Sequence, residues 1–523
     1  MTFDSERLPV IVAYAQAIEK EELIGAAELM NRATASALDG TGPLANRIDR
    51  VSVVGIMSKI SPSPATDLAK RFHISPQHTE TTQVGGNFPQ WLISRAADEI
   101  ASGNARAVMI AGAEAQHTQK MRRKLREQGI EPPPSTGVSD TAGANAGDGT
   151  TSPGDMTSDD TDASARNSVP DNVVGDPRAG VSSNELAAGL IAPVHVYPMF
   201  ESVLASRAQR TYQEQREFIA GFLSPFSEVA AKHPFAWFPQ VRSPQELYTI
   251  TPQNRLIAEP YPKLMSAFID VNQAACVIVT SLAVARECGL AESAIYCWSG
   301  ADVNDVWYPS SRPDPGVSQG IREAGRAALD AANVSIDDVS LFDLYSCFPC
   351  AVELACDALG IGLDDSRGLT VTGGLPYFGG PGNNYTLHAI ATMADRLKES
   401  GGVGLVSGLG WYATKHSIGI YSDSPPVNGW VRGNVADAQA RIDAGEITVI
   451  GGVDTEEPGT VVASTIIVDA AGNPESAPVI VALGSGQRVV GTISSDELAG
   501  LSGVNLVGKK VTVQGTPPVC HLT

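Results

Sequence analysis

The pattern of apolar and polar residues predicts two α/β segments with a break between them. In the first segment, short apolar runs rich in β-branched residues alternate with stretches of helical periodicity. Apolar runs without polar alternation are typical of strands in a sheet that is covered on both faces. The expected strands are residues 9–14, 51–56, 81–84 and 105–112, and the expected helices are residues 22–38 and 89–102.

The pattern breaks at residues 131–181, which are rich in Pro, Gly, Ser, Thr and Asp. Such a composition buries too little apolar surface to fold alone, so we expect a mobile insertion here. Helical periodicity returns at residues 185–251, and a second α/β segment covers about 267–421. Its expected strands are 274–280, 294–298 and 339–344, and its expected helices are 316–332, 351–359 and 385–398.

The two α/β segments share a local order of elements. Val84-Gly-Gly-Asn87 is followed by an expected helix and then by the apolar run 107–113. Gly382-Asn-Asn384 is followed in the same way by a helix and by the run 404–410. The repeated order predicts a duplicated fold with facing helix N-termini. Chance similarity between two strand–helix units stays open as the alternative.

A different pattern begins after the linker at residues 422–430. Short alternating segments recur there at regular spacing between Gly, Asp, Asn and Pro, which is typical of a small β-barrel or sandwich. The expected strands of this additional domain, residues 431–523, are 447–450, 460–468, 478–483, 488–493 and 510–513.

Composition narrows the class of protein. The chain of 523 residues is long enough for several domains, and its net charge of −21 argues against general binding to nucleic acids or anionic membranes. No apolar run approaches the roughly 18 residues of a membrane span. Acidic residues near the N-terminus do not fit a signal or transit peptide. We therefore expect a cytoplasmic protein.

Cysteine placement argues for free thiols. All seven cysteines lie at position 276 or later, and an odd number in a cytoplasmic chain does not suggest a disulfide framework. Cys347 and Cys350 form a CxxC, but no second pair follows at zinc-ligand spacing. We therefore expect no metal site.

The stretch from Val371 to His388 is rich in glycine and proline and leads into an expected helix. A glycine-rich turn before a helix offers unpaired N–H groups and the positive end of the helix dipole. This arrangement stabilises a phosphate, a carboxylate or a developing oxyanion. A tight turn capped by Asn383 or Asn384 is the structural alternative.

Three segments resemble motifs of the thiolase superfamily. Gly85-Gly-Asn-Phe-Pro-Gln-Trp91 falls where thiolases place the cysteine that becomes acylated. Tyr345-Ser-Cys-Phe-Pro349 falls on the NEAF motif and is similar to the HDCF version of sterol-carrier-protein thiolases. Gly373-Gly-Leu-Pro-Tyr-Phe-Gly-Gly-Pro381 falls on the turn that ends in Gly-His-Pro. The likeness covers about residues 8–421, and the extra β tail is similar to the branch called thiolase-like protein type 1.

The resemblance implies an α/β fold with a duplicated five-layered α-β-α-β-α core, an inserted loop domain and a small C-terminal all-β barrel. It divides the chain into an N-terminal half (1–117), a loop domain with the insertion (118–262), a C-terminal half (263–421), the linker and the β domain. It also implies CoA or acyl-CoA as a substrate, with no permanently bound cofactor. Thiolases are usually dimers, so the expected partner is a second copy, or another protein at the β domain.

The sequence departs from the family where thiolases carry their chemistry. Gly85 stands at the place of the acylated cysteine, and Gly380 at the place of the Gly-His-Pro histidine. The cysteine near the last core strand is replaced around Ser407. Without nucleophile, base and acid, ordinary ping-pong thiolysis is not expected. The backbone N–H groups that the family uses as oxyanion holes do not depend on these side chains.

The candidate catalytic residues are His388, Cys347, Asn384 and Tyr345, with His416 in second rank. His388 follows the lost histidine by about two helical turns and has the ordinary pKa range of a general base; a core or capping histidine is the alternative. A helix dipole would lower the pKa of Cys347, whereas a buried structural cysteine is inert. Tyr345, Asn384 and His416 are polar residues that are more often structural.

The densest basic cluster follows the first α/β half. Its members are Lys120, Arg122, Arg123 and Lys124, and charge-assisted bonds from them are suited to the phosphates of CoA. A solvated helix face is the alternative. Gly379 and Gly380 are the expected backbone contacts of the ligand.

Two functions remain open at the level of the sequence. The first is an acyl-CoA enzyme similar to acetyl-CoA acetyltransferases of lipid metabolism, which performs acyl transfer or Claisen or retro-Claisen chemistry without a cysteine intermediate. The second is a non-catalytic acyl-CoA-binding or lipid-binding module that recruits a partner. The preference for the first depends on analogy with the family.

Overall fold

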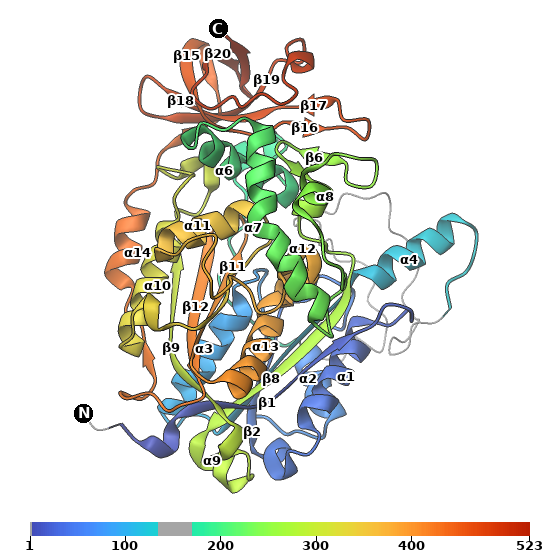
Figure 1. The fold of residues 1–523 in the computed structure, drawn as a ribbon, viewed down its shortest axis with the longest axis vertical. Coiled ribbons are helices and arrows are strands. Elements are labelled where there is room, and N and C mark those ends of the chain that lie inside the picture. The colour runs from blue at the N-terminus through green and yellow to red at the C-terminus, as the bar shows by residue number, and fades with distance from the viewer. Residues whose placement is uncertain (1–2, 134–169) are drawn as a thin grey trace.

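The computed structural model describes residues 3–133 and 170–523 of the chain. Its centre is one continuous mixed sheet, to which each half of the chain contributes one side (Figure 1). The N-terminal half supplies strands in the order β3-β2-β4-β8-β1, and β8 runs antiparallel to both of its neighbours. These strands are β1 (Pro9–Ile18), β2 (Ile48–Val53), β3 (His78–Thr82), β4 (Ala107–Ala115) and β8 (Asn272–Ser281).

The C-terminal half repeats this order as β10-β11-β12-β9. Its strands are β9 (Ile295–Asn304), β10 (Leu341–Asp343), β11 (Val403–Gly410) and β12 (Lys415–Ser422). No described strand takes the place of β3. The segment that follows β10 is held there by a bond from Leu344 N–H to Leu369 O over 2.9 Å, and by bonds from the N–H groups of Val371 and Thr372 to the carboxylate of Asp343. β1 and β9 join the two sides, with Val10 opposite Tyr296. The repeated strand order confirms the predicted duplication.

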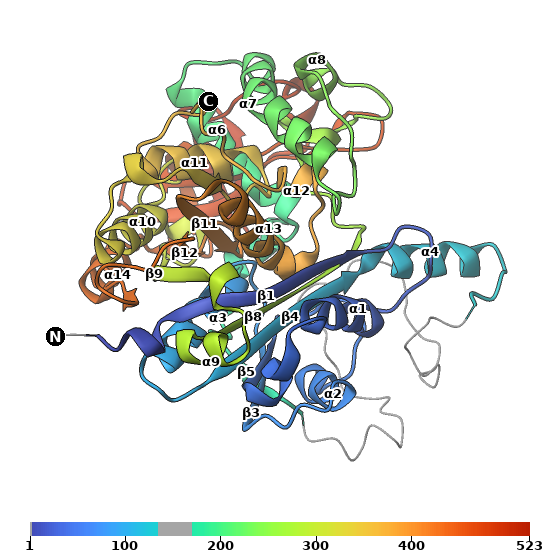
Figure 2. The same cartoon turned by 60° about the horizontal axis from the view of Figure 1, so that its bottom comes forward.

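Helices form three layers around the two sides of the sheet (Figures 1 and 2). The central helices, α3 (Phe88–Ala101) and α13 (Tyr385–Ser400), contact each other and strands of both halves. α1 (Ala26–Leu38) and α2 (Pro64–Arg71) cover the outer face of the N-terminal side. α10 (Gln319–Ala332) covers the outer face of the C-terminal side, with α11 (Pro349–Leu359) packed beside it. This is the expected five-layered α-β-α-β-α core.

The chain between the halves is mainly helical, as expected. Its elements are α4 (Gln116–Glu127), β5 (Asn172–Val174), α5 (Ser183–Ala187), α6 (Pro193–Arg207), α7 (Tyr212–Lys232), α8 (Pro244–Tyr248), β6 (Leu256–Ala258) and β7 (Tyr261–Pro262). Figure 2 shows α4 projecting from the body of the molecule.

The expected mobile insertion at residues 131–181 lies mostly outside the described residues. For its last part the prediction was wrong, because β5 pairs in parallel with the outer edge of β3. The carboxylate of Asp171 also accepts a hydrogen bond from the N–H of Ala65, at the start of α2, over 2.7 Å. An open strand edge favours such pairing, and two of the three residues of β5 are valines.

The C-terminal domain is a closed five-stranded barrel, because β19 pairs with β18 and also with β21. The strands are β14 (Val449–Ile450), β15 (Val453–Ser464), β18 (Pro478–Leu483), β19 (Arg488–Ile493), β20 (Lys510–Gly515) and β21 (Val519–Leu522), with β14 attached outside the ring. A hairpin of β16 (Ile467–Val468) and β17 (Pro474–Ser476) pairs with β6. Of the two expected forms, barrel or sandwich, the structure is the barrel.

The chain crosses to this barrel later than residue 431. β13 (Val431–Arg432) pairs with β9 of the large sheet, and α14 (Ala436–Asp443) packs on α10 and β9. The barrel itself therefore begins only near β14. No helix in the described parts of the chain has the length and apolar character to cross a bilayer.

Candidate functional site

The two glycine-rich turns predicted from the sequence meet between the halves of the core. The N–H of Gly85 donates to Asn383 Oδ1 over 2.9 Å, and the hydroxyl of Thr386 donates to Gly86 O over 2.7 Å. Asn383 also donates to Gly55 O at 2.8 Å. These bonds hold the first turns of α3 and α13 side by side. The facing helix N-termini expected from the repeat are therefore present.

The third motif supplies a hydroxyl to the same place. The hydroxyl oxygen of Tyr345 lies over Gly86, where a Cβ would overlap it, and the carbonyl of Leu409 lies 2.6 Å from that Cβ position. The N–H of Tyr345 donates to the Ser407 hydroxyl over 2.9 Å, and its ring meets Tyr385 edge-on at 5.4 Å. Burial raises the pKa of the Tyr345 hydroxyl, so this group is a neutral hydrogen-bond donor.

A residue that the sequence reasoning missed stands next to Gly85. Lys415, at the start of β12, donates from its Nζ to Val84 O over 2.5 Å. Its Nζ lies 2.7 Å from the point where a Cβ of Gly85 would be. The available signal was a lysine that stands three residues before the short apolar run 418–421, where a charge needs a reason to be buried.

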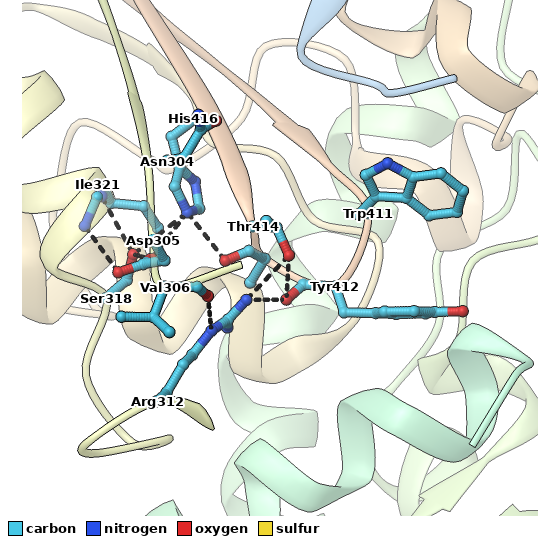
Figure 3. Close-up of polar contacts among 12 residues, drawn as sticks. Asn304, Asp305, Val306, Arg312, Ser318, Ile321, Trp411, Tyr412, Thr414 and His416 are labelled. Carbon is cyan, nitrogen blue, oxygen red and sulfur yellow. Dashed lines mark hydrogen bonds and ion pairs between the residues drawn. The ribbon is translucent and has the colours of Figure 1, made fainter. Parts of the chain in front are cut away.

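The turn between β11 and β12 carries backbone strain. Trp411 and Ala413 have φ of 55° and 50°, a region that residues other than glycine rarely adopt. The hydroxyl of Tyr197 donates to Trp411 O over 2.8 Å and accepts from Ala413 N. Buried Arg312 donates to Tyr412 O at 2.8 Å (Figure 3). The surroundings thus impose the conformation that places Lys415.

His416, the second-rank candidate, belongs to a buried polar cluster on the other side of this turn (Figure 3). Its Nε2 lies 3.0 Å from Asp305 Oδ2 and 3.4 Å from the Ser318 hydroxyl, which itself donates to Asp305 over 2.5 Å. The bond with His416 and the nearby charge of Arg312 hold the pKa of Asp305 below its usual range although burial opposes them. The cluster caps α10 and fixes the end of β9.

His388 is separated from the glycine turns by its orientation on α13. Its Nδ1 lies 2.8 Å from Gln16 Oε1 on β1, and its ring meets Phe378 at 5.3 Å. The side chain is fully buried, and burial, together with His233, lowers its pKa to about 3. A ring with this pKa is a weak base, so its environment favours the alternative of a core histidine.

Cys347 and Asn384 have structural surroundings. Burial raises the pKa of the Cys347 thiol to about 12, so the expected lowering by a helix dipole was wrong. Helix α11 begins only at Pro349, two residues after Cys347. The effect of burial on the pKa of Cys347 therefore outweighs any effect of the helix dipole. Asn384 donates from its side chain to Gly112 O on β4 over 2.9 Å. It stands at the N-cap position of α13 but makes no side-chain capping bond there.

The expected ligand-binding residues lie in two separate places. Gly379 has φ of 116°, and a Cβ there would be 2.6 Å from Gln273 Oε1. Gly380 donates its N–H to Phe268 O over 2.8 Å, so this donor is already used. The basic residues lie on the projecting helix α4, where Lys120 pairs with Asp270 and Arg123 with Glu127. Lys124 is exposed, and Arg122 donates to Pro133 O at 3.0 Å.

No protein-family model matches the sequence, and no curated protein matches it. Among solved structures, the chain is similar to a monomeric SCP2-thiolase like protein type 1 (STLP1) from Mycobacterium smegmatis, with a TM-score of 0.80 and 29% identity over 100% of both chains. It is also similar to the structure named Ltp2-ChsH2(DUF35) aldolase, with a TM-score of 0.56 and 16% identity. That match covers 80% of this chain and 99% of the other, and it shows the fold alone. The first similarity confirms the resemblance to thiolase-like proteins of type 1 with an additional C-terminal domain.

Proposed function

We propose that this thiolase-like protein binds CoA thioesters and performs acyl transfer, or makes or breaks a carbon–carbon bond beside the thioester carbonyl, without acylating a cysteine. The observation that carries the proposal is the meeting of the two glycine turns and Tyr345 between α3 and α13. Backbone at a helix N-terminus and a neutral hydroxyl are suited to a carbonyl oxygen that becomes negative during reaction.

The thiols of this chain argue for a direct reaction. Cys347 is the one cysteine in the three motifs, and its pKa of about 12 keeps it protonated at neutral pH. Gly85 offers no nucleophilic side chain, and a thiol or an enolate of a second substrate can attack the carbonyl without an enzyme-bound acyl group. The neutral hydroxyl of Tyr345 would donate a hydrogen bond to the carbonyl oxygen.

Carbon–carbon chemistry is also consistent with one similar fold. The structure named Ltp2-ChsH2(DUF35) aldolase is, by its name, a protein that acts on carbon–carbon bonds. At 16% identity this likeness is an analogy and selects no substrate. It makes β-hydroxyacyl-CoA a second substrate class to test beside β-ketoacyl-CoA.

For the CoA moiety we propose the exposed basic face of α4, with Arg123 and Lys124 as its phosphate contacts. Within residues 3–133 and 170–523, the one ion pair of Arg123 is an exposed pair with Glu127 at 3.8 Å. Such a pair costs little to exchange for a phosphate. Lys120 is less available because it is paired with Asp270. Replacing Arg123 and Lys124 together by Gln should weaken CoA binding about tenfold at low salt, whereas Arg326→Gln on α10 should not.

The test uses the full-length chain with acetoacetyl-CoA plus CoA, and separately with a β-hydroxyacyl-CoA. We expect binding by calorimetry, formation of thioester products by chromatography, and no acyl adduct in the intact mass of the protein. Tyr345→Phe should reduce turnover by about 10²-fold to 10³-fold, as does the loss of one oxyanion donor. An acyl adduct on any residue would contradict the direct reaction.

The second candidate is a non-catalytic acyl-CoA-binding or lipid-binding module that recruits a partner. The loss of the usual nucleophile and base at Gly85 and Gly380 favours it. The name of the similar aldolase joins two components, Ltp2 and ChsH2(DUF35), and we place the partner of this chain at the C-terminal barrel. Binding of CoA thioesters with no product from either substrate class would select this candidate.

A further inference from the structure

Lys415 fills the space that Gly85 leaves open. Its Nζ and Cε lie 2.7 Å and 2.9 Å from the point where a Cβ on Gly85 would be. By the resemblance to thiolases, this is the point at which the acylated cysteine would enter the site. In place of a thiol in the turn before α3, the structure therefore has an amine that comes from β12.

The surroundings of Lys415 favour its neutral form. The side chain is 3% exposed, and its Nζ lies 4.3 Å from the centre of the Phe88 ring. Among the residues that the structure describes, it forms no ion pair, and burial lowers its pKa to about 8. The charged groups that face it are Asp176, which raises this pKa, and Arg178, which lowers it. Roughly a tenth of the amine is thus unprotonated at pH 7, and roughly half of it at pH 8.

Other polar groups converge on the same point. The Oδ1 of buried Asn87 lies 2.6 Å from the Cβ position of Gly85 and has no hydrogen-bond partner among the described residues. The hydroxyl of Tyr345 lies over the next residue, Gly86. An amine, an amide oxygen and a hydroxyl thus surround two adjacent glycines. An unpaired buried acceptor is costly in a fold that only has to be stable, and it indicates a place for a ligand donor.

We propose that Lys415 is the general base of this site and that it carries a proton between the two substrates. The proposal rests on the proposed function above and adds the residue that replaces the missing cysteine and histidine. It requires a second substrate with an ionisable proton, namely the thiol of CoA or the α-carbon of an acyl-CoA.

The proton balance is simple in the cleavage direction. The neutral amine of Lys415 takes the proton of the CoA thiol while the sulfur forms a bond to the β-carbonyl carbon of β-ketoacyl-CoA. The carbonyl electron pair moves to oxygen, where the Tyr345 hydroxyl donates a hydrogen bond. Collapse of this oxyanion breaks the bond between the α- and β-carbons, and the Lys415 ammonium returns its proton to the α-carbon of the thioester enolate. Two thioesters leave, and the amine is neutral again.

The substitution Lys415→Arg distinguishes a general base from a residue that is only structural. Arg at position 415 keeps a cation against Phe88 and a donor for Val84, but it is not deprotonated in proteins. A structural requirement for a buried cation would therefore be met by Lys415→Arg, whereas a general base would be lost. Lys398→Met is a matched control, because Lys398 also stacks on a ring, Tyr14 at 4.6 Å, and also has a pKa lowered by burial.

The first experiment measures Lys415 itself in the full-length protein. Competitive acetylation with acetic anhydride, read by peptide mass spectrometry across pH, gives the pKa of each lysine. We expect a pKa of about 8 for Lys415. We also expect saturating acetoacetyl-CoA to slow the acetylation of Lys415 about tenfold and to leave Lys398 unchanged, because the bound ligand would cover the amine.

The second experiment compares Lys415→Arg and Lys415→Met with the wild type. We expect Kd for acetoacetyl-CoA to change less than about threefold and single-turnover cleavage to fall about 10²-fold to 10⁴-fold, the usual contribution of a general base. In the wild type the rate should rise with pH through about 8. Circular dichroism melting checks that both variants fold.

The outcomes distinguish the two proposals. If the wild type cleaves acetoacetyl-CoA but Lys415→Arg retains its rate, or the substrate does not protect Lys415, the general-base role is wrong and the proposed function stands. If the wild type neither binds nor cleaves any CoA thioester, the proposed function falls, and the role of Lys415 falls with it.

Discussion

At the scale of single residues, the missing side chain at Gly85 is as informative as a present one. A glycine at this position could reflect only the loss of a nucleophile. Here, however, Lys415 and Asn87 occupy the space that a side chain at position 85 would take. Gly86 is similarly required, because any Cβ would overlap the Tyr345 hydroxyl. The absence of side chains at both glycines therefore allows Lys415 from β12 and Tyr345 from the segment after β10 to lie close to the turn before α3.

Gly85→Ala should destabilise the fold and displace the amine. The residue has φ of 156°, and a Cβ would lie 2.6 Å from Asn87 Oδ1 and 2.7 Å from Lys415 Nζ. We expect a loss of about 1–3 kcal/mol in the free energy of unfolding, the usual cost of such backbone strain. Urea denaturation measures it. Gly380→Ala is the control, because its nearest contact would be 3.2 Å and the change should cost less; equal losses in both variants would contradict this account.

The pKa of His388 predicts a specific dependence of stability on pH. The folded state keeps this ring neutral down to pH of about 3, whereas the unfolded chain protonates it below pH of about 6.5. Stability is therefore lost as the pH falls from about 6.5 towards 3, by about 1.4 kcal/mol per pH unit. His388→Gln should flatten the acid side of the curve and leave catalysis unchanged. His233, with a pKa of about 4, acts in the same direction and remains in the variant.

Urea titrations at pH 7, 6 and 5 check this prediction. The gap in stability between wild type and His388→Gln should narrow at each step. His78→Gln, at an exposed histidine, is the control and should run parallel to the wild type. Parallel curves for His388→Gln would show that the ring is protonated in the folded state, and a fall in turnover would restore it as a catalytic candidate.

At the scale of elements, the sequence predicted those helices and strands that have a regular local pattern of apolar residues. The helices before and after the glycine turns, and strands such as β18 (Pro478–Leu483) and β19 (Arg488–Ile493), were predicted close to their bounds. β12 was missed because Trp411 and Ala413 break the pattern with backbone that sequence does not reveal. β5 was missed because its three residues gain stability only from the edge of β3.

The candidate site was predictable only in part, for a related reason. The glycine turns and Tyr345 stand in motifs that are continuous in the sequence. Lys415 reaches the site because β11 and β12 pair with Gly410 opposite Lys415, a contact set by the turn between them. The role of His388 as a base stays a prediction. Its position relative to the lost histidine could not be read from helical spacing, because Gly380 lies before the start of α13.

Arg312 should control the strained turn. Its guanidinium is 4% exposed and donates to Val306 O over 3.0 Å and to Thr414 Oγ1 over 3.0 Å, in addition to Tyr412 O. Arg312→Met removes these donors and leaves Asp305 without a nearby cation, so we expect a loss of about 3–5 kcal/mol. Arg326→Met, in an exposed pair with Asp330, should cost less than about 1 kcal/mol. Guanidinium denaturation distinguishes them, and similar midpoints would contradict the role of Arg312.

At the scale of the whole molecule, the barrel is connected to the site through α6. Ser202 on this helix accepts from the barrel at Ser464 N over 3.1 Å, and its carbonyl accepts from Asn505 Nδ2 over 2.8 Å. On the same helix, Tyr197 holds the turn that precedes Lys415. The additional domain therefore supports the helix that fixes the candidate site (Figure 1).

Arg488 should be the principal polar contact that docks the barrel. It is 5% exposed and donates to Ser310 O over 3.1 Å and to Pro313 O over 2.9 Å, both outside the barrel. Arg488→Met would leave these carbonyls without donors while the interior of the barrel, on the opposite faces of its strands, keeps its packing. We therefore expect thermal unfolding of the variant to separate into two transitions, with faster proteolysis in the segment 444–448 between α14 and β14. Lys510→Met, at an exposed lysine of the same barrel, should keep the wild-type profile. One transition at the wild-type temperature in Arg488→Met would mean that the apolar contacts and the β16–β6 pairing dock the barrel without this residue.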